Sequence, residues 1–263
     1  MTSLVGDLRF VRWSGGCAFL GTWVAIVPMH SHQAIQVVLT EAGECLLRDS
    51  DNSSGLSCGL GIVPSRQPHS LDATSIDLCM VLFVEPETRE GRALTESFLA
   101  DGIAALPREL VASAAEVLFS EFRARRGDPL MANAVQGVVH ALTGEVEPAV
   151  ITDERILRAI DYINGHLDSD VTLDTVAAQV FLSPGRFRHL FVEQTGIGLR
   201  PFILWRRLMR SWELAMEGVP LSTAAHQAGF ADSSHLARTS KRTIGAAPSG
   251  WRMSATPRAL GIA

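Results

Sequence analysis

Long apolar segments are absent from this chain of 263 residues. No run of about 18 apolar residues exists and no charged-then-apolar leader opens the sequence, so neither membrane spanning nor secretion is expected. The expected location is the cytoplasm. Cysteines are few, and Cys17, Cys45, Cys58 and Cys79 show no CxxC spacing. We therefore expect reduced thiols that act as small buried hydrophobic groups.

Sequence signatures of several enzyme classes are also missing. The chain has no GxxxxGK[ST] phosphate loop and no HExxH zinc-protease pair. The pair Gly59-Leu-Gly61 lacks the third glycine and the following helix of a dinucleotide-binding turn. Lysine is nearly absent, because Lys241 stands beside 22 arginines, a bias that we attribute to genome composition. No catalytic residue and no cofactor is expected, and we expect the protein not to be an enzyme.

The net charge of −5 hides an uneven distribution. Residues 1–150 carry 10 basic and 18 acidic side chains, whereas residues 151–263 carry 13 basic and 10 acidic ones. Within 183–242 there are 9 basic against 4 acidic side chains. A local positive excess is what phosphate contacts require, although an ordinary mixed-sign solvated surface would give the same counts.

The first 86 residues have the pattern of β structure. Short apolar runs rich in β-branched residues alternate with clusters of glycine, proline, aspartate, asparagine and serine, notably at 49–55. These runs cover residues 23–27, 35–39, 62–63 and 78–83. Many short strands separated by turn signals predict a small antiparallel barrel or sandwich.

Two further regions are predicted to be helical. Apolar residues recur at helical spacing in 110–118 and in 131–142, on either side of a strong break at 125–129. Their apolar faces fit packing on the β domain and packing on a second subunit equally well. After the linker Glu145-Val-Glu-Pro148, the remaining chain from 151 to 256 is predicted to be helical throughout.

One helix-turn-helix pattern occurs twice between residues 173 and 251, with the copies 48 to 49 residues apart. In each copy a short apolar helix face ends at a turn, and a second helix opens with a hydroxyl cap, at Ser183 and at Ser233-Ser234. Between the copies, Pro201 opens a helix with a single apolar stripe. A continuous helix there would fix the distance between the two second helices, which in such motifs enter the major groove of DNA.

The residues around both turns follow one ordered pattern. Its members are Leu182-Ser183, Phe187-x-x-Leu190-Phe191, Gly196, Gly229-Phe230-x-Asp232-Ser-Ser-His235-Leu236-x-Arg238 and Gly245-x-x-Pro248-Ser249-x-Trp251. This pattern resembles the arabinose-regulator (AraC/XylS) family of bacterial transcription factors over roughly the last 100 residues. The resemblance implies a seven-helix domain with reader helices at about 183–193 and 233–242.

By this resemblance, nine side chains would face double-stranded DNA. Arginine can grip guanine in bidentate fashion, and serine can contact bases or phosphates. The candidates are Arg186, Arg188 and His189 in the first reader helix, Ser233, Ser234, His235 and Arg238 in the second, and Lys241 and Arg242 at phosphates. About half of them could instead decorate a solvated face, because most protein–DNA contacts go to the backbone.

Three positions depart from the family pattern. His189 stands where the family usually has arginine, which leaves the half-site preference open. Ser240 replaces a usually buried phenylalanine, so we expect weaker packing of the second reader helix, and Ser211 replaces alanine. None of these departures removes the motif.

The segment His30-Ser-His32-Gln-Ala-Ile-Gln36, followed by Gly43 and Pro64-x-x-x-Pro68-His69, resembles the cupin-type sensor barrel that precedes this DNA-binding domain. In cupin enzymes an HxH pair, a glutamate and a later histidine hold a divalent metal. Gln36 occupies the glutamate position, so no metal site is assigned. His30, His32, Gln36 and His69 are expected to contact a small-molecule effector, because His30 and His32 share a strand face. Hydrogen-bonding pocket or surface residues are the alternative.

The expected fold is α+β with two domains. A cupin-like barrel (1–86) and a helical connector or dimerisation segment (87–147) precede an all-α double helix-turn-helix domain (151–256). The expected function is an effector-responsive bacterial transcription activator, a homodimer on DNA with RNA polymerase as an implied partner. The alternatives are a metal-dependent cupin enzyme with a vestigial DNA-binding domain and an effector-independent dimeric regulator.

Overall fold

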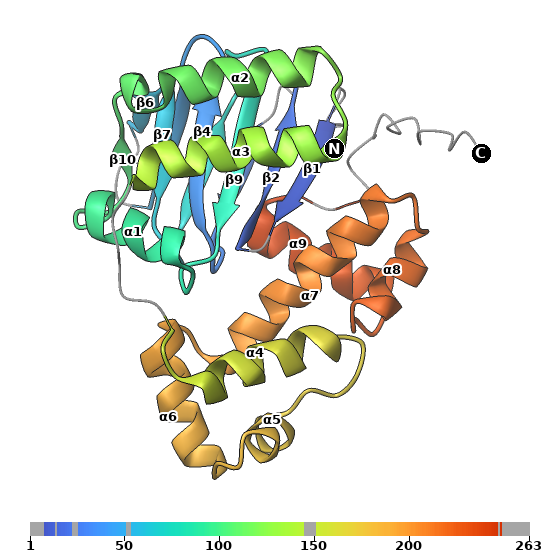
Figure 1. Ribbon diagram of the computed structural model, residues 1–263. Helices are drawn as coiled ribbons and strands as arrows, with labels where there is room; N and C mark the ends of the chain where they lie inside the picture. The colour runs from blue at the N-terminus through green and yellow to red at the C-terminus, as the bar shows by residue number, and fades with distance from the viewer. Residues whose placement is uncertain are drawn as a thin grey trace.

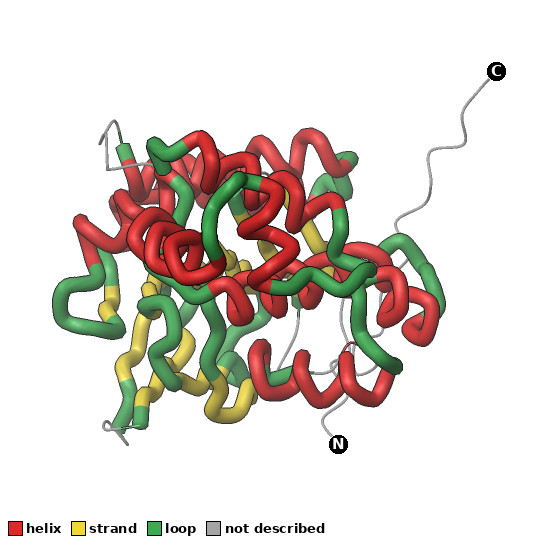
Figure 2. The backbone as a smooth tube through the Cα atoms, turned by 90° about the horizontal axis from the view of Figure 1, so that it is seen from below, coloured by secondary structure: helices red, strands yellow, loops and turns green. Residues whose placement is uncertain are grey.

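The computed structural model describes residues 8–13, 15–22, 26–50, 54–144, 151–246 and 248. The amino-terminal half is rich in strands and the carboxy-terminal half is helical, which confirms the expected order of the two halves (Figure 1). Seen from below, the strands gather in one part of the molecule with helices beside them (Figure 2). No helix among these residues is long and apolar enough to cross a membrane.

The strands form two antiparallel sheets that face each other across a shared apolar interior. The first has the order β1 (Leu8–Trp13), β2 (Gly16–Gly21), β9 (Cys79–Val84), β4 (Ile35–Thr40), β7 (Leu60–Val63) and β10 (Ala104–Ala105). The second has the order β3 (Ile26–His30), β8 (His69–Asp72), β5 (Cys45–Asp49) and β6 (Leu56–Cys58). The described strands therefore make a β sandwich and do not close into one barrel.

Both faces of the six-stranded sheet are covered, which explains why its central strands are continuous apolar runs. Along β2 and β9, Phe19 and Val81 face the interior of the sandwich, whereas Leu20 and Leu82 face outward. The outward face packs against α2 (Ala112–Arg123) and α3 (Asp128–Thr143), which lie across the sheet in Figure 1. The two helices predicted on either side of the 125–129 break are thus present, and they pack on this chain.

The described helical half contains six helices, arranged around two separate cores. They are α4 (Glu154–Gly165), α5 (Leu173–Gln179), α6 (Pro184–Thr195), α7 (Leu199–Met216), α8 (Leu221–Gln227) and α9 (Ser233–Ile244). The described residues thus contain six of the seven helices that the resemblance implies, and Ser249 and Trp251 of the family pattern lie outside the described residues. Helices α4, α5 and α6 and the start of α7 form one apolar cluster of their own.

The second helix-turn-helix unit shares its core with the β sandwich. Leu208 and Trp212 of α7 and Leu236 and Ile244 of α9 belong to the same apolar cluster as the sandwich interior. The rings of Phe19 and Trp212 meet edge to face, with centroids 5.1 Å apart. Helix α7 therefore joins an independent first unit to a second unit that is docked on the β domain (Figure 1).

A buried ion cluster fastens α7 to the β domain. The guanidinium of Arg206 lies 2.8 Å from Glu85 and 3.1 Å from Glu87, in the segment that follows β9 toward α1 (Arg89–Phe98). All three side chains are nearly inaccessible to solvent. Burial raises the pKa of Glu87 to about 7 and also raises the pKa of Glu85. Arg206 thus pairs directly with both carboxylates in the interface between the two halves, and Arg12 also favours the charged form of Glu85.

Candidate DNA-reading helices and the histidine cluster

The first helix-turn-helix unit is defined by local capping. Thr172 and Thr175 form a reciprocal capping box at the start of α5. Ser183 caps α6 by accepting a hydrogen bond from the backbone N–H of Arg186, and Pro184 follows at the first helical position. Helix α6 begins at Pro184, as the sequence predicts, and ends at Gly196, which adopts the left-handed conformation.

The second unit uses a carboxylate where the sequence predicted a hydroxyl cap. Asp232 accepts a 2.7 Å hydrogen bond from the backbone N–H of His235, and α9 begins at Ser233. Ser233 and Ser234 therefore lie in the first turn of the helix, where capping does not require their hydroxyl groups. The expected hydroxyl cap of the second reader helix is wrong, because Asp232 occupies the N-cap position.

Gly229 and Arg207 hold the two units in a fixed relation. Gly229 has a φ of +78°, and a Cβ there would lie 2.0 Å from the carbonyl oxygen of Leu167. Arg207 of α7 donates to that same carbonyl at 2.9 Å and to the carbonyl of Ser169 at 2.7 Å. The turn of the second unit, the central helix and the end of α4 thus meet at one point, which only glycine can occupy.

Ser240 is buried and hydrogen-bonded on both sides. Its hydroxyl accepts from the indole N–H of Trp212 at 3.2 Å and donates to the carbonyl of Ala246 at 2.6 Å. The hydroxyl thereby links α7, α9 and the segment after α9. Ser211, the other small replacement, donates to the carbonyl of Leu208 within α7 at 2.7 Å. Ser240 therefore contributes polar links where the sequence analysis expected only lost apolar packing.

All nine candidate DNA contacts are exposed, while the opposite faces of their helices are buried. In α6, Phe187 and Phe191 fill the core, and in α9 Leu236 does the same. Arg188 and Arg238 make no ion pair with the described part of the chain. Each helix thus presents a basic face free to meet an anionic partner.

Phe181 lies in the turn between α5 and α6, and sequence reasoning gave it no role. Its side chain is 90% exposed and its φ is +56°, a left-handed conformation that is costly for phenylalanine. We expect Phe181→Gly to be more stable than Phe181→Ala by about 1 kcal/mol, because only glycine lacks the Cβ that makes this φ unfavourable. Urea denaturation of both variants measures this difference, and an alanine variant as stable as the glycine variant would contradict the strain.

The four candidate effector residues form one buried cluster. His30 ends β3, His69 opens β8 beside it, His32 follows in the loop and Gln36 lies on β4. The His30 and His69 ring centroids are 4.3 Å apart, and those of His32 and His69 are 5.0 Å apart. The Oε1 atom of Gln36 lies 3.1 Å from Nε2 of His32 and 3.2 Å from Nε2 of His69. The four side chains thus lie together in one buried cluster, as a shared pocket requires.

These imidazoles are held in the neutral form. Burial, followed by the neighbouring histidines, lowers the pKa of His69 to about 2. Burial together with His30 lowers the pKa of His32 to about 4, and burial also lowers the pKa of His30. Neutral imidazole keeps one nitrogen with a free lone pair, so near neutral pH each ring can act as an acceptor or a ligand.

The cavity beside the cluster is small and is closed by a reader helix. It measures about 20 Å³, room for about one water molecule. Its wall includes Phe19 and Phe83 of the sandwich together with Ile244, at the end of α9. Gly245 packs so closely there that a Cβ would lie 2.3 Å from Val27 and 3.2 Å from Nδ1 of His30. The histidine cluster is thus in direct contact with the end of the second reader helix.

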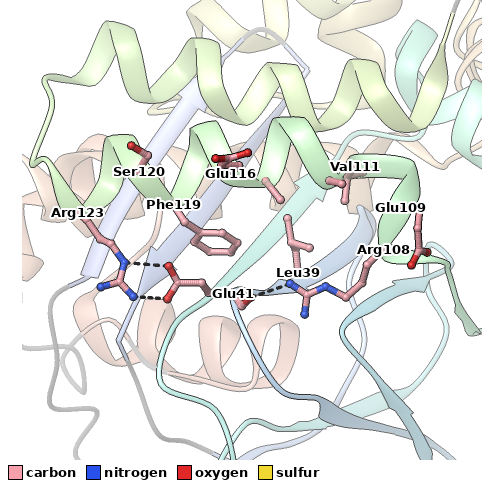
Figure 3. A pocket seen from close by; sticks show the side chains of 11 residues that line it. Leu39, Glu41, Arg108, Glu109, Val111, Glu116, Phe119, Ser120 and Arg123 are labelled. Carbon is pink, nitrogen blue, oxygen red and sulfur yellow. Dashed lines mark hydrogen bonds and ion pairs between the residues drawn. The ribbon is translucent and has the colours of Figure 1, made fainter.

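A larger pocket, of about 540 Å³, lies on the outer side of the β domain beneath α2 (Figure 3). Leu39, Val111 and Phe119 contribute apolar lining. On its rim, Arg123 pairs with the carboxylate of Glu41, and Arg108 donates to the carbonyls of Thr40 and Glu41. Both arginines are engaged within the chain, and none of the four candidate effector residues lines this pocket.

One motif that sequence reasoning missed is Gly55-Leu-Ser-Cys-Gly59, which has the GxSxG spacing of serine hydrolases. Ser57 lies within β6, paired with β5, and its hydroxyl donates to Glu44 at 2.6 Å. A nucleophile elbow requires a sharp turn from a strand into a helix, and β6 is followed by β7. The motif therefore lacks the geometry of a catalytic serine.

Comparisons with known proteins agree with this architecture. A family model described as a helix-turn-helix domain matches residues 176–254. The arabinose operon regulatory protein of Escherichia coli K12 is 36% identical over 105 residues, an alignment that covers 38% of this chain and only 35% of that protein. A protein named "Probable transcriptional regulator LumQ", from Photobacterium leiognathi, is 24% identical over 233 residues and covers 85% of this chain and 91% of its own length.

Among solved structures, that of fatty-acid-bound ToxT from Vibrio cholerae strain SCE256 matches almost the whole chain. The TM-score is 0.52 at 13% sequence identity, with 95% of this chain and 94% of that chain covered. This likeness shows a shared two-part fold, with a β-rich half before a helical half. The two matches that cover most of the chain are thus 24% and 13% identical to it, whereas the match at 36% identity covers 38% of the chain.

Proposed function

The chain belongs to the arabinose-regulator (AraC/XylS) family through its carboxy-terminal domain, and from that membership we propose that it is a bacterial sequence-specific transcriptional regulator. The observation that carries this proposal is the pair of exposed basic helices, α6 and α9, connected through the single continuous helix α7. Eighteen residues at 1.5 Å each give α7 a length of about 27 Å. That length suits two readers in successive major grooves.

The nine exposed side chains divide into two proposed roles. Arg188 and Arg238 point from the solvent faces of α6 and α9 and are proposed to read base edges, since arginine pairs with guanine through two hydrogen bonds. Lys241 and Arg242, in the last turn of α9, are proposed to contact phosphates. Ser233 and Ser234, released from capping by Asp232, lie where the first turn of a reader helix approaches bases or backbone.

We propose that the β domain senses a small molecule and controls the second reader unit. The shared apolar cluster of the sandwich, α7 and α9 supports this, because a change at the histidine cluster alters the surface on which α9 rests. ToxT has been crystallised with an unsaturated fatty acid bound, so a chain of this fold does hold a small molecule. An effector would shift the population of arrangements able to occupy two adjacent half-sites.

The remaining elements of the proposal follow from family membership. We keep the division into a cupin-like sensor domain (1–86), a connector and dimerisation segment (87–147) and a DNA-binding domain (151–256). The relatives reported above are named as regulators, and we propose activation of transcription by a homodimer in the cytoplasm, with RNA polymerase as a partner and no enzymatic activity. Direct repeats near a promoter would be the target.

Selection from genomic DNA tests the proposal. Purified full-length protein is mixed with fragmented DNA of its own organism at two salt concentrations, and bound fragments are sequenced. We expect a bipartite site with about 10 base pairs between half-site centres, and weaker recovery at higher salt. Salt-sensitive recovery without any enriched sequence, both with and without cell extract as a source of effector, would refute sequence-specific recognition.

A further inference from the structure

The three histidines are oriented as ligands usually are. In each ring Nδ1 lies 2.8–2.9 Å from a backbone carbonyl oxygen, that of Pro28 for His30, of Ala34 for His32 and of Gln67 for His69. One ring nitrogen of each residue lies within 4.8 Å of the others. A metal-bound histidine typically donates its other N–H to a carbonyl, which fixes the tautomer and the direction of the lone pair. Here all three rings have that second contact.

Within the cluster of His30, His32, His69 and Gln36, the hydrogen-bond donors do not match the acceptors. A neutral imidazole has one N–H, and in each ring a carbonyl stands opposite Nδ1, so the Nε2 atoms are left as acceptors. Oε1 of Gln36, another acceptor, faces two of them, while its amide nitrogen is buried without a partner. Turning the amide around would supply hydrogens to two rings and would leave the amide oxygen in the position without a partner. In either orientation one polar atom of the Gln36 amide stays buried without a partner, whereas a bound metal ion would accept the lone pairs of the rings with the amide as it stands.

We propose that His30, His32 and His69 bind one divalent transition-metal ion, with Oε1 of Gln36 beside it as a neutral oxygen ligand. Imidazole nitrogens suit zinc, cobalt, nickel or copper, and the described cluster contains no carboxylate that would favour magnesium or calcium. The cavity has room for a guest of atomic size, whereas a sugar or lipid would require α9 to move. The sequence analysis left this set without a metal because Gln36 replaces glutamate. The second contacts of the rings could not be read from the sequence.

Binding of a metal ion to the three histidines would change the packing at the end of the second reader helix, α9. Tetrahedral zinc sites with Zn–N bonds of about 2.0–2.1 Å place the nitrogens roughly 3.4 Å apart. The candidate ligand nitrogens now lie within 4.8 Å of one another, so they must move closer together around the ion. His30 contacts the backbone at Gly245, and Ile244 forms part of the cavity wall. Closing the rings therefore alters the support of the end of α9. The metal site does not depend on the proposed function, but its effect on DNA binding rests on it.

Titration of metal-free, untagged full-length protein tests the site. Isothermal calorimetry with Zn²⁺ and the visible absorption of added Co²⁺ are expected to show one ion per chain. His32→Ala and His69→Ala should weaken binding by at least about 100-fold, since each removes a ligand that fixes the ion. His140→Ala, an exposed histidine on α3, is the matched control and should bind as the parent does. Absence of saturable binding, or equal binding by all variants, would overturn the proposal.

A variant that is expected to gain metal affinity provides a test that misfolding could not mimic. Gln36→Glu supplies the carboxylate that the set lacks, so we expect tighter Zn²⁺ binding and a larger metal-induced rise in Tm than in the parent. Without metal the same buried carboxylate should lower Tm, because its charge is then unpaired. A Gln36→Glu protein that folds but gains no metal affinity would contradict the placement of Gln36 beside the ion.

Hydrogen exchange separates the coupling from the proposed function. Zn²⁺ should change the exchange of the α9 backbone amides in the parent and leave it unchanged in His32→Ala, in both cases without DNA. Unchanged α9 exchange at full occupancy would overturn the coupling to the reader helix. If metal binds and α9 responds but genomic selection enriches no sequence, the proposed regulatory function fails while the metal site stands.

Discussion

Replacing Arg188 and Arg238 by alanine together is expected to weaken binding to a selected genomic site by at least about 30-fold, because each arginine that reads a base contributes about 1–3 kcal/mol. Both side chains are exposed and make no ion pair in the described part of the chain. Arg188 lies on the first reader helix, α6, and Arg238 lies on the second, α9. Their removal leaves the buried faces of α6 and α9 intact, so the fold should be unaffected. Fluorescence anisotropy with labelled DNA at fixed salt measures the change.

Arg126→Ala is a matched control, since Arg126 is an exposed arginine in the segment between α2 and α3, on the β domain. It should bind DNA as the parent does. The salt dependence distinguishes the two kinds of contact, because loss of a phosphate contact lowers the slope of log K against log salt by about one, whereas loss of a base contact relaxes specificity at one position. A double variant that retains parental affinity and specificity would rule out the proposed reader surface.

The double helix-turn-helix region could be predicted in detail because its signals are local. Ser183, Pro184 and Gly196 each act within one turn of α6: Ser183 is the N-cap, Pro184 is the first helical residue and Gly196 is the C-cap. The choice between Asp232 and Ser233 as the cap of α9 could not be made from residue type alone, since aspartate and serine cap equally well. It depends on the register with which Leu236 enters the core.

The β domain was predicted less completely because sheets depend on distant partners. The sequence analysis did not predict the strands β1 and β2. Two of the six residues of β1 are arginines, and β2 begins and ends with glycine. Their pairing with each other and with β9 places them in the sheet. Likewise, nothing local shows that the strands divide into two sheets, or that Phe19 meets Trp212 from a helix nearly 200 residues away.

The histidine cluster lies between these two cases. The HxH spacing predicted that His30 and His32 share a strand face, whereas in the structure His30 ends β3 and His32 lies in the loop that follows. Their ring centroids are nevertheless 5.5 Å apart, and Pro68-His69 supplies the third ring. The size of the cavity and its closure by Ile244 are tertiary facts, because they depend on the docking of α9 against the sandwich. Sequence reasoning treated sensor and reader as separate domains, whereas in the structure the sensor interior and the second reader unit are one core.

Arg206 connects α7 to the β domain through Glu85 and Glu87, next to this shared core. We therefore expect its replacement to weaken the packing between the two halves more than other single substitutions. Arg206→Ala is expected to reduce the free energy of unfolding by about 3 kcal/mol at pH 8, because two buried carboxylates then lose the cation that compensates them. Glu85 and Glu87 would be left with solvent nearly excluded, and the contact of the guanidinium with the Phe202 ring, 4.8 Å away, would vanish too. Urea denaturation followed by circular dichroism measures the loss.

The pH dependence of the Arg206→Ala loss identifies its cause. A carboxyl whose folded pKa is raised adds stability below its unfolded pKa, here 4.5, and that stability is lost as the pH rises through the folded value of about 7 for Glu87. Without Arg206 both folded pKa values should rise further, so the variant should regain much of its deficit between pH 8 and pH 5. Arg210→Ala is the control one turn later, where a half-exposed pair with Glu213 should contribute about 0.5 kcal/mol or less. Equal losses in the two variants, or a deficit independent of pH, would mean that apolar packing alone holds α7 on the sandwich.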